Sequence, residues 1–97
     1  MKKNILIVGS GFYGSVMARK LALSGKFNIH VVDERNHIAG NCYTEVDTKT
    51  EVTVHQYRPH VFNTDKLRIW KYIQQFSEFA QYIHCAKTVT QQGIFLC

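Results

Sequence analysis

The feature that most constrains the fold of this 97-residue chain is a glycine-rich turn set between an apolar run and a helical pattern. The apolar run covers residues 4–8, and the hexapeptide Gly-Ser-Gly-Phe-Tyr-Gly follows it directly at residues 9–14. A helical pattern extends over residues 12–24, and a second apolar run occupies residues 28–33. This order predicts two buried parallel strands joined by a right-handed crossover helix, which is an α/β arrangement.

Each glycine of the turn has a physical role in such a unit. Gly9 permits the sharp exit from the strand, Gly11 lets a phosphate approach the backbone, and Gly14 allows close packing of the helix. The helix N-terminus presents free N–H groups and the positive end of its dipole to an anion. Asp33 ends the second run, where a carboxylate can accept hydrogen bonds from ribose hydroxyls. We therefore predict a unit that binds the ADP half of a dinucleotide, with a purely structural glycine turn as the alternative.

The residues after the acid narrow the choice of dinucleotide. An acidic Asp33 disfavours a 2′-phosphate, although Arg35 stands close enough to weaken that argument. The segment 33–41 resembles the flavoprotein extension of the dinucleotide motif, with Ala39-Gly40 where that extension has a Gly-Gly pair. Small residues there would let backbone N–H groups reach the cofactor. This favours FAD over NAD, and an ordinary polar loop is the alternative interpretation.

A histidine-containing block occupies residues 54–64. His55 and His60 suggest metal ligation or acid–base chemistry in principle, but no third ligand stands near them at a metal-binding spacing, so we expect no metal site. Pro59 fixes its own φ and is expected to hold Arg58 extended. The block suits a rigid loop that presents His60, and it equally suits a plain connector.

Taken together, the glycine turn, the segment 33–43 and the histidine block resemble UDP-galactopyranose mutase over residues 3–96. The histidine block carries the specificity, since the family has His-x-Tyr-Gly-Pro-His-(Ile/Val)-Phe-His-Thr there. Two residues depart from this pattern: Arg58 replaces the glycine before the proline, and Asn63 replaces a histidine. Arg58 puts the local turn in question, and Asn63 removes a titratable group near the expected flavin.

The resemblance implies a fold, an activity and a set of site residues. The fold would be a Rossmann-like βαβ unit that binds FAD, as the N-terminal fragment of a larger flavoprotein. The family interconverts UDP-galactopyranose and UDP-galactofuranose through a reduced-flavin N5 adduct, in the biosynthesis of cell-surface polysaccharides. The residues that we expect at the cofactor are Gly9, Gly11, Phe12, Tyr13, Gly14, Asp33, Glu34, Arg35, Gly40, Asn41, His60, Val61 and Phe62.

Length and composition bound what the chain can do by itself. Ninety-seven residues predict one domain at most, residues 1–97, with a small core. Members of the resembled family are several times longer, so we expect a fragment that lacks the substrate-binding part and its catalytic contacts, and that is inactive alone. UDP-galactose would be the substrate of the full-length protein, which we expect to be a cytoplasmic isomerase and possible homodimer.

Charge and cysteine content exclude other classes. The net charge of +5 is scattered, with no basic run longer than Lys2-Lys3, so we expect no nucleic-acid partner. No apolar run is long enough for a membrane span or a signal peptide. Three cysteines without framework spacing, Cys42, Cys85 and Cys97, indicate free thiols.

The remaining pattern predicts few regular elements. We expect loops over residues 34–64 with a short strand at 51–55, then a helix at about 65–80 with Thr64 as its N-cap. A hairpin is predicted with strands at 87–90 and 94–97. Two alternative functions remain open at this point: a fragment of another FAD- or NAD-dependent oxidoreductase, and a truncated nucleotide-binding module without turnover.

Overall fold

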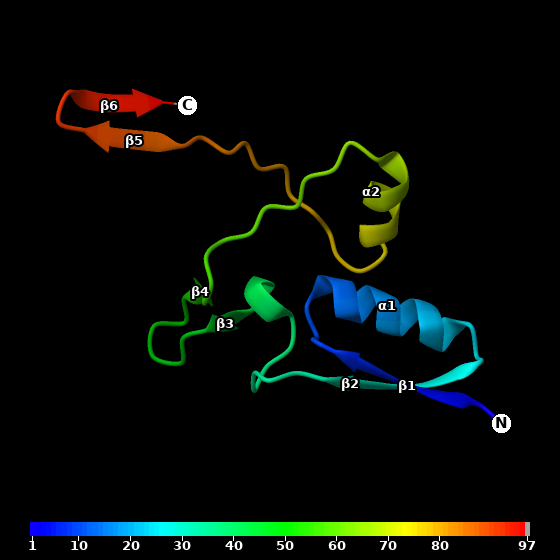
Figure 1. Ribbon diagram of the computed structural model, residues 1–97. Coiled ribbons are helices and arrows are strands. Elements are labelled where there is room, and N and C mark those ends of the chain that lie inside the picture. The colour runs from blue at the N-terminus through cyan, green and yellow to red at the C-terminus, as the bar shows by residue number, and fades with distance from the viewer. Residues whose placement is uncertain (97) are drawn as a thin grey trace. The chain divides into compact units, whose positions relative to one another are not determined.

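A computed structural model describes residues 1–96 of the chain, shown in Figure 1. Within it the chain divides into two compact units, of which the first runs Met1–His60 and the second begins at Val61. The first unit contains the glycine-rich turn and both apolar runs. The second contains one helix and one hairpin.

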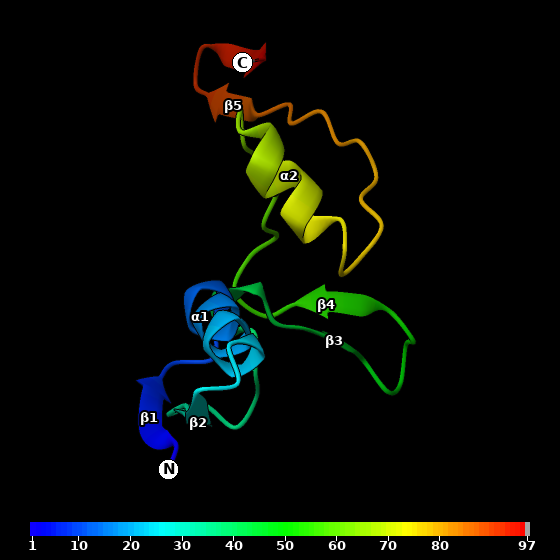
Figure 2. The same ribbon diagram turned by 90° about the vertical axis from the view of Figure 1, so that its right-hand side faces the viewer.

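The first unit opens with the predicted βαβ arrangement. Strand β1 (Lys3–Val8) is followed by helix α1 (Phe12–Leu23) and strand β2 (Phe27–Val32). The two strands pair in parallel, with Lys3 opposite Phe27 and Val8 opposite Val32. Helix α1 lies across one face of this two-stranded sheet (Figures 1 and 2). The predicted α/β fold with a crossover helix is confirmed.

The ends of α1 follow from backbone chemistry. The N-cap of α1 is Gly11, which has an extended backbone. Glycine has no side chain, so the free N–H groups of the first helical turn are not capped from this position. At the other end, the N–H of Gly25 donates to the carbonyl of Ala22 (3.0 Å), and Gly25 has φ +69°. Glycine adopts this left-handed conformation at low cost, and the predicted helix end is therefore confirmed.

The sheet is covered on one face only, which corrects the prediction of a fully buried strand. Ile5 and Ile7 alternate with Leu6 and Val8, and the first pair is partly covered while Leu6 is 62% and Val8 78% exposed. Alternate strand residues point to opposite faces, so the second pair lies on the face away from α1. Among residues 1–96 no hydrophobic side chain is buried, because two strands and one helix enclose no interior. The small core that we expected is absent from this part of the chain.

The rest of the first unit is more regular than predicted. A 3₁₀ turn, η1 (Gly40–Cys42), leads into strand β3 (Thr44–Val46), which pairs antiparallel with β4 (Thr53–His55). The predicted strand at 51–55 is confirmed over its last three residues, and β3 was predicted as loop. Asp47 closes the connection between them: its Oδ1 accepts bonds from the N–H groups of Lys49 (3.0 Å) and Thr50 (2.8 Å) and from the Thr50 hydroxyl (2.9 Å).

The second unit holds a helix shorter than the predicted 65–80. Helix α2 spans Leu67–Ile73, and its N-cap is Lys66 rather than Thr64. The Thr64 hydroxyl instead accepts a bond from the N–H of Lys66 (3.1 Å), so it stabilises the turn before the helix. The apolar stripe continues beyond Ile73 in the sequence, but Phe76 is 53% exposed, and a short helix depends on burial of its apolar face for most of its stability.

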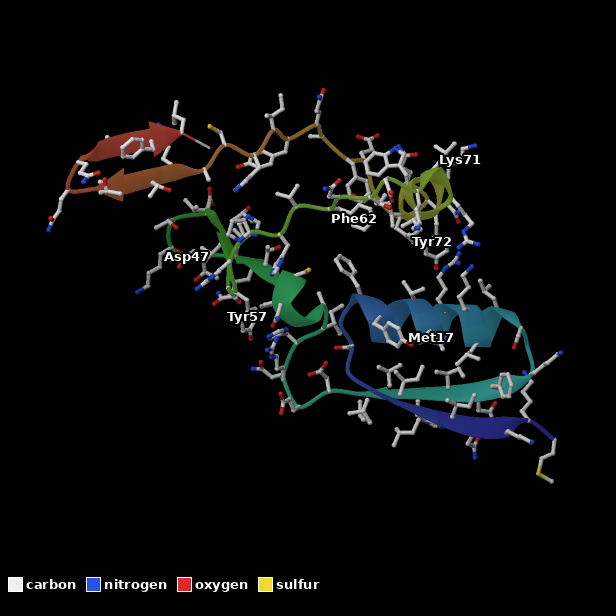
Figure 3. All side chains as sticks on the ribbon, turned by 45° about the horizontal axis from the view of Figure 1, so that its top comes forward. Met17, Asp47, Tyr57, Phe62, Lys71 and Tyr72 are labelled. Carbon is white, nitrogen blue, oxygen red and sulfur yellow. The ribbon has the colours of Figure 1, made fainter. Side chains whose placement is uncertain are left out.

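Aromatic rings and a hairpin complete the second unit. The ring of Trp70 lies 5.4 Å from that of Phe79 and 6.3 Å from that of Phe62 (centroid distances). Phe62 is labelled in Figure 3. Strands β5 (Lys87–Thr90) and β6 (Gly93–Leu96) pair antiparallel, which confirms the predicted hairpin as far as Leu96. Cys97, the last residue of the predicted second strand, lies outside the described residues.

Candidate dinucleotide-binding site

The glycine-rich turn brings the start of α1 against the end of β1. Gly9 has φ +103°, and its N–H donates to the carbonyl of Val32 (2.7 Å), which ties the turn to the end of β2. A Cβ on Gly14 would lie 1.9 Å from the carbonyl oxygen of Gly9. No side chain can occupy that space, so Gly14 sets the close approach of helix and turn that the sequence predicted.

A second glycine contact brings the loop after β2 onto the same turn. A Cβ on Gly40 would lie 3.1 Å from the Cα of Gly11, which is a tight contact, whereas a Cβ on Gly11 would lie 3.9 Å from the Cα of Gly40, an ordinary van der Waals distance. The N–H of Ala39 also donates to the carbonyl of Ser10 (3.1 Å). Residues 39–41 therefore form a wall beside the turn, at the position where the sequence predicted small residues to face a cofactor.

Ser10 connects the parts of this arrangement, and the sequence reasoning gave it no role. It is 7% exposed, and its N–H and hydroxyl both donate to Oδ2 of Asp33, each over 2.7 Å. Its carbonyl accepts the hydroxyl of Ser15 (3.1 Å) as well as the Ala39 N–H. The sequence did contain a signal for this role. Ser10 stands between two glycines just after a strand, where its short side chain can reach the acid at the end of the neighbouring strand.

These bonds fix the charge state of Asp33. Its Oδ1 accepts a bond from the N–H of Arg35 (2.9 Å), and the two bonds from Ser10 reach Oδ2. The backbone bond from Arg35, followed by the bonds from Ser10, lowers the pKa of Asp33 from 3.8 to about 2, since all three favour the charged carboxylate. Each carboxylate oxygen has about two acceptor positions, so Oδ1 keeps one for a ligand hydroxyl.

An open pocket of about 510 Å³ lies between the turn, the end of β2 and the following loop. Its lining residues are Val8, Gly9, Gly11, Asp33, Glu34, Arg35, Gly40 and Asn41. All but Val8 were predicted at the cofactor, so these predicted positions meet in one place. A pocket that is walled by glycines and carries a carboxylate suits the pyrophosphate and ribose of the ADP half of a dinucleotide.

The other predicted positions lie elsewhere. Phe12 and Tyr13 stand on the first turn of α1 and are 66% and 83% exposed, and Gly14 is buried against the turn rather than in the pocket. His60 is exposed at the end of the first unit. Val61 and Phe62 belong to the second unit, where the Phe62 ring contacts Trp70 and Phe79. Their role at a flavin ring stays a prediction.

A polar and aromatic cluster lies beside the pocket and was not predicted. The Arg35 guanidinium lies 4.3 Å from the centroid of the Tyr57 ring and donates to Oδ1 of Asn41 (2.9 Å). The Tyr57 hydroxyl and Nε2 of His37 are 2.8 Å apart, and the His37 ring stacks on Tyr43 at 4.0 Å. Figure 3 labels Tyr57, close to the end of β4.

Three non-glycine residues of the described chain adopt positive φ, which favours glycine: Ala39, Glu51 and Arg58. Ala39 and Arg58 stand where the resembled family has glycine. Ala39 has φ +73° and Arg58 has φ +91°. The prediction that Pro59 holds Arg58 extended is therefore wrong. The restraint from the following proline acts mainly against the right-handed helical region, and here the turn after β4 places Arg58 on the positive-φ side instead.

Comparison with known proteins agrees with this geometry. A family model described as an NAD(P)-binding Rossmann-like domain matches residues 7–76. The chain belongs to this family. The matched range begins at the end of β1 and includes the glycine turn, α1, β2, the loop that walls the pocket and the cluster around Tyr57.

The chain is similar to several proteins that are named as sugar-nucleotide mutases. It is 43% identical over 93 residues to a protein of Klebsiella pneumoniae named probable UDP-galactopyranose mutase, covering 96% of this chain and 24% of that protein. It is 44% identical over 78 residues to a dTDP-fucopyranose mutase of Escherichia coli (80% of this chain, 20% of that protein). A UDP-galactopyranose mutase of Mycoplasma genitalium is 44% identical over 81 residues (84% and 20%).

These matches confirm the predicted resemblance to UDP-galactopyranose mutase. The chain spans about a fifth to a quarter of the length of these relatives. In the described residues, no helix is long and apolar enough to cross a membrane, and no three His, Cys, Asp or Glu side chains gather as a metal site would require. Cys42 and Cys85 are free cysteines, and Cys97 lies outside the described residues.

Proposed function

We propose that this chain is the FAD-binding part of a UDP-galactopyranose mutase, and that it holds the ADP half of FAD in the pocket between Gly11, Asp33 and Gly40. One observation carries the proposal: the glycine turn, the acid after β2 and the small-residue loop after it meet around a single open pocket. The relatives at 43% and 44% identity that are named UDP-galactopyranose mutase support the assignment of the parent activity.

The residues present fit the cofactor. The Gly11–Gly40 approach leaves backbone without side chains, which suits a pyrophosphate, and the N-terminus of α1 carries no capping side chain that would compete for its N–H groups. The open acceptor position on Oδ1 of Asp33 suits a ribose hydroxyl. Asp33 stays ionised throughout the physiological range, because its pKa is about 2.

The chemistry of the proposed reaction belongs to the cofactor, since a bound reduced flavin supplies the nucleophile for ring contraction of the sugar without net redox change. The residues of this chain bind and orient the nucleotide end of that cofactor. We assign no catalytic residue to the chain and expect no mutase turnover from it alone, because the contacts to a sugar nucleotide would come from elsewhere in a longer protein.

Two observations leave related functions to be separated by experiment. The family description names NAD(P), so an NAD-dependent oxidoreductase fragment is the second candidate. The match to a dTDP-fucopyranose mutase is as close as the matches to the UDP-galactose enzymes, so this part of the protein does not distinguish the sugar nucleotide. We propose UDP-galactopyranose as the substrate on the number of relatives so named.

The proposal is tested first by titrating the purified chain with FAD, ADP, NAD and NADP in a calorimeter. We expect saturable binding of FAD and ADP, weaker binding of NAD, and little binding of NADP, because a 2′-phosphate would meet the Asp33 carboxylate. The variant Asp33→Asn should weaken FAD and ADP together, and Asp47→Asn, on the exposed β3–β4 connection, is the matched control. Preference for NAD over FAD would favour the oxidoreductase alternative, and no binding by a chain with a folded circular dichroism spectrum would refute the proposal.

A further inference from the structure

The Arg35 side chain is held in place from two directions at the edge of the pocket. Its guanidinium lies over the Tyr57 ring at 4.3 Å from the centroid and donates to Asn41 over 2.9 Å. Among the described residues that line the pocket, Arg35 is the one basic side chain, and it stands beside the carboxylates of Asp33 and Glu34. The position of this positive charge therefore determines the electrostatic potential at the place where an anionic ligand would bind.

Building on the proposed function, we propose that Tyr57 is a positioning residue for dinucleotide binding, which acts through Arg35. Tyr57 does not line the pocket, and its sequence position is 22 residues beyond Arg35. Its ring face nevertheless provides the platform on which the guanidinium lies. A guanidinium stacks well on an aromatic face because it is planar and weakly hydrated.

Tyr57 is itself oriented by a chain of contacts that starts at Ile38, in the loop just before the pocket wall. Nδ1 of His37 lies 2.8 Å from the carbonyl of Ile38, so Nδ1 carries a proton and donates to it. In the neutral ring Nε2 then accepts the bond from the Tyr57 hydroxyl (2.8 Å). The stacked rings of His37 and Tyr43, 4.0 Å apart and 10° from parallel, hold the imidazole plane.

Because the Tyr57 ring already holds the Arg35 guanidinium, this side chain is preorganised for binding an anion. An arginine side chain free in solvent loses rotamer entropy when it meets a ligand, and one already held on a ring loses less. The two carboxylates in the pocket would repel the pyrophosphate, and a fixed guanidinium offsets that repulsion at a defined place. Loss of the Tyr57 ring should therefore weaken binding only while Arg35 is present.

A double-mutant cycle tests this coupling. Tyr57→Leu removes the ring face, Tyr57→Phe keeps it and removes the hydroxyl, and each is made in the wild-type chain and with Arg35→Ala. We expect the ADP dissociation constant to rise about 2- to 5-fold for Tyr57→Leu, the range that an exposed cation–π contact supports. Tyr57→Phe should stay within about twofold of the wild type. With Arg35→Ala present, Tyr57→Leu should produce no further change.

The outcomes separate this inference from the function on which it rests. An equal loss from Tyr57→Leu with and without Arg35 would show that Tyr57 acts on the fold and would overturn the inference, while ADP binding by the wild type would leave the proposed function standing. No ADP binding by the folded wild type would overturn both.

An NMR measurement on the wild type covers the case in which Tyr57→Leu fails to fold. Protons that lie over an aromatic face are shifted upfield, so the Arg35 Hδ signals should be upfield of those of exposed arginines and should stay so when ADP saturates the site. Loss of that shift on ADP binding would overturn the inference, since Arg35 would then leave the Tyr57 ring to meet the ligand.

Discussion

One oxygen of Asp33 receives both polar hydrogens of Ser10. The backbone N–H and the hydroxyl of Ser10 each lie 2.7 Å from Oδ2, and this pair of bonds joins the turn after β1 to the end of β2. The acid that would face a ribose is thus also the acid that closes the turn. In the proposed site, binding and local folding therefore share a single carboxylate.

Replacing Ser10 with alanine removes one of the two bonds and leaves the backbone bond in place. We expect the pKa of Asp33 to rise from about 2 toward its ordinary value of 3.8, because a bond that favours the charged form is lost. A carbon-detected NMR titration of the Asp33 carboxyl measures this directly. Ser24→Ala is the control, since the Ser24 hydroxyl bonds to Leu21 at the far end of α1. An unchanged Asp33 titration in Ser10→Ala would contradict the bonding seen here.

Acid should destabilise the first unit through Asp33. The pKa is lowered in the folded chain, so the charged carboxylate contributes stability above pH 3.8, and that contribution is lost as the pH falls through about 2. Bonds from Thr50 and Lys49 lower the pKa of Asp47 as well, so it adds to the same trend. Urea unfolding between pH 5 and pH 2 should show a falling free energy.

Substitution apportions this pH dependence between the two acids. Asp33→Asn should flatten part of the slope, and the double variant Asp33→Asn with Asp47→Asn should flatten it further. A slope in the double variant equal to that of the wild type would assign the acid sensitivity to other groups.

Gly14 should tolerate no side chain. Its Cβ would lie 1.9 Å from the Gly9 carbonyl oxygen, a backbone atom that cannot move aside without opening the turn. We expect Gly14→Ala to lose about 3 kcal/mol or more of unfolding free energy, at the upper end of overpacking effects. Gly25→Ala is the comparison, because nothing lies within 4 Å of its Cβ and only the positive φ is penalised, at about 1–2 kcal/mol. Equal losses in the two variants would contradict the close helix–turn contact.

Glycine at position 58 should stabilise the chain. Arg58 has φ +91°, a conformation that costs a residue with a Cβ more than it costs glycine. We expect Arg58→Gly to gain about 0.5–1 kcal/mol in thermal or urea unfolding. Arg58→Ala keeps the Cβ and serves as the control for loss of the side chain, so it should show no such gain. A stabilisation by alanine equal to that by glycine would place the effect in the arginine side chain instead.

The elements that the sequence predicted well are those with a local physical cause. The βαβ unit follows from two apolar runs, a glycine turn and Gly25, and each of these acts within a few residues. The meeting of Gly11, Asp33 and Gly40 at one pocket also followed, because parallel strands place their carboxyl ends at one edge of the sheet.

The parts that were missed depend on partners distant in sequence. Strand β3 has only three residues and is defined by its pairing with β4, so its own segment carries little pattern. The Arg35–Tyr57 and Ser10–Asp33 contacts join positions more than 20 residues apart, which periodicity does not reveal. Helix α2 was instead predicted too long, because the apolar stripe on which the prediction rested continues to Phe79 while the helix ends at Ile73.

The uncovered face of the β1–β2 sheet has a thermodynamic consequence. Leu6 and Val8 already contact solvent in the folded chain, and no hydrophobic side chain in the described residues is buried, so unfolding would hydrate less new apolar surface than it does in a densely packed domain. The heat capacity increment and the urea dependence of unfolding should therefore be small for a chain of this length. A small unfolding entropy means that a given binding free energy moves the melting temperature further, so a nucleotide in the pocket should shift the thermal midpoint by more degrees than it would in a densely packed domain.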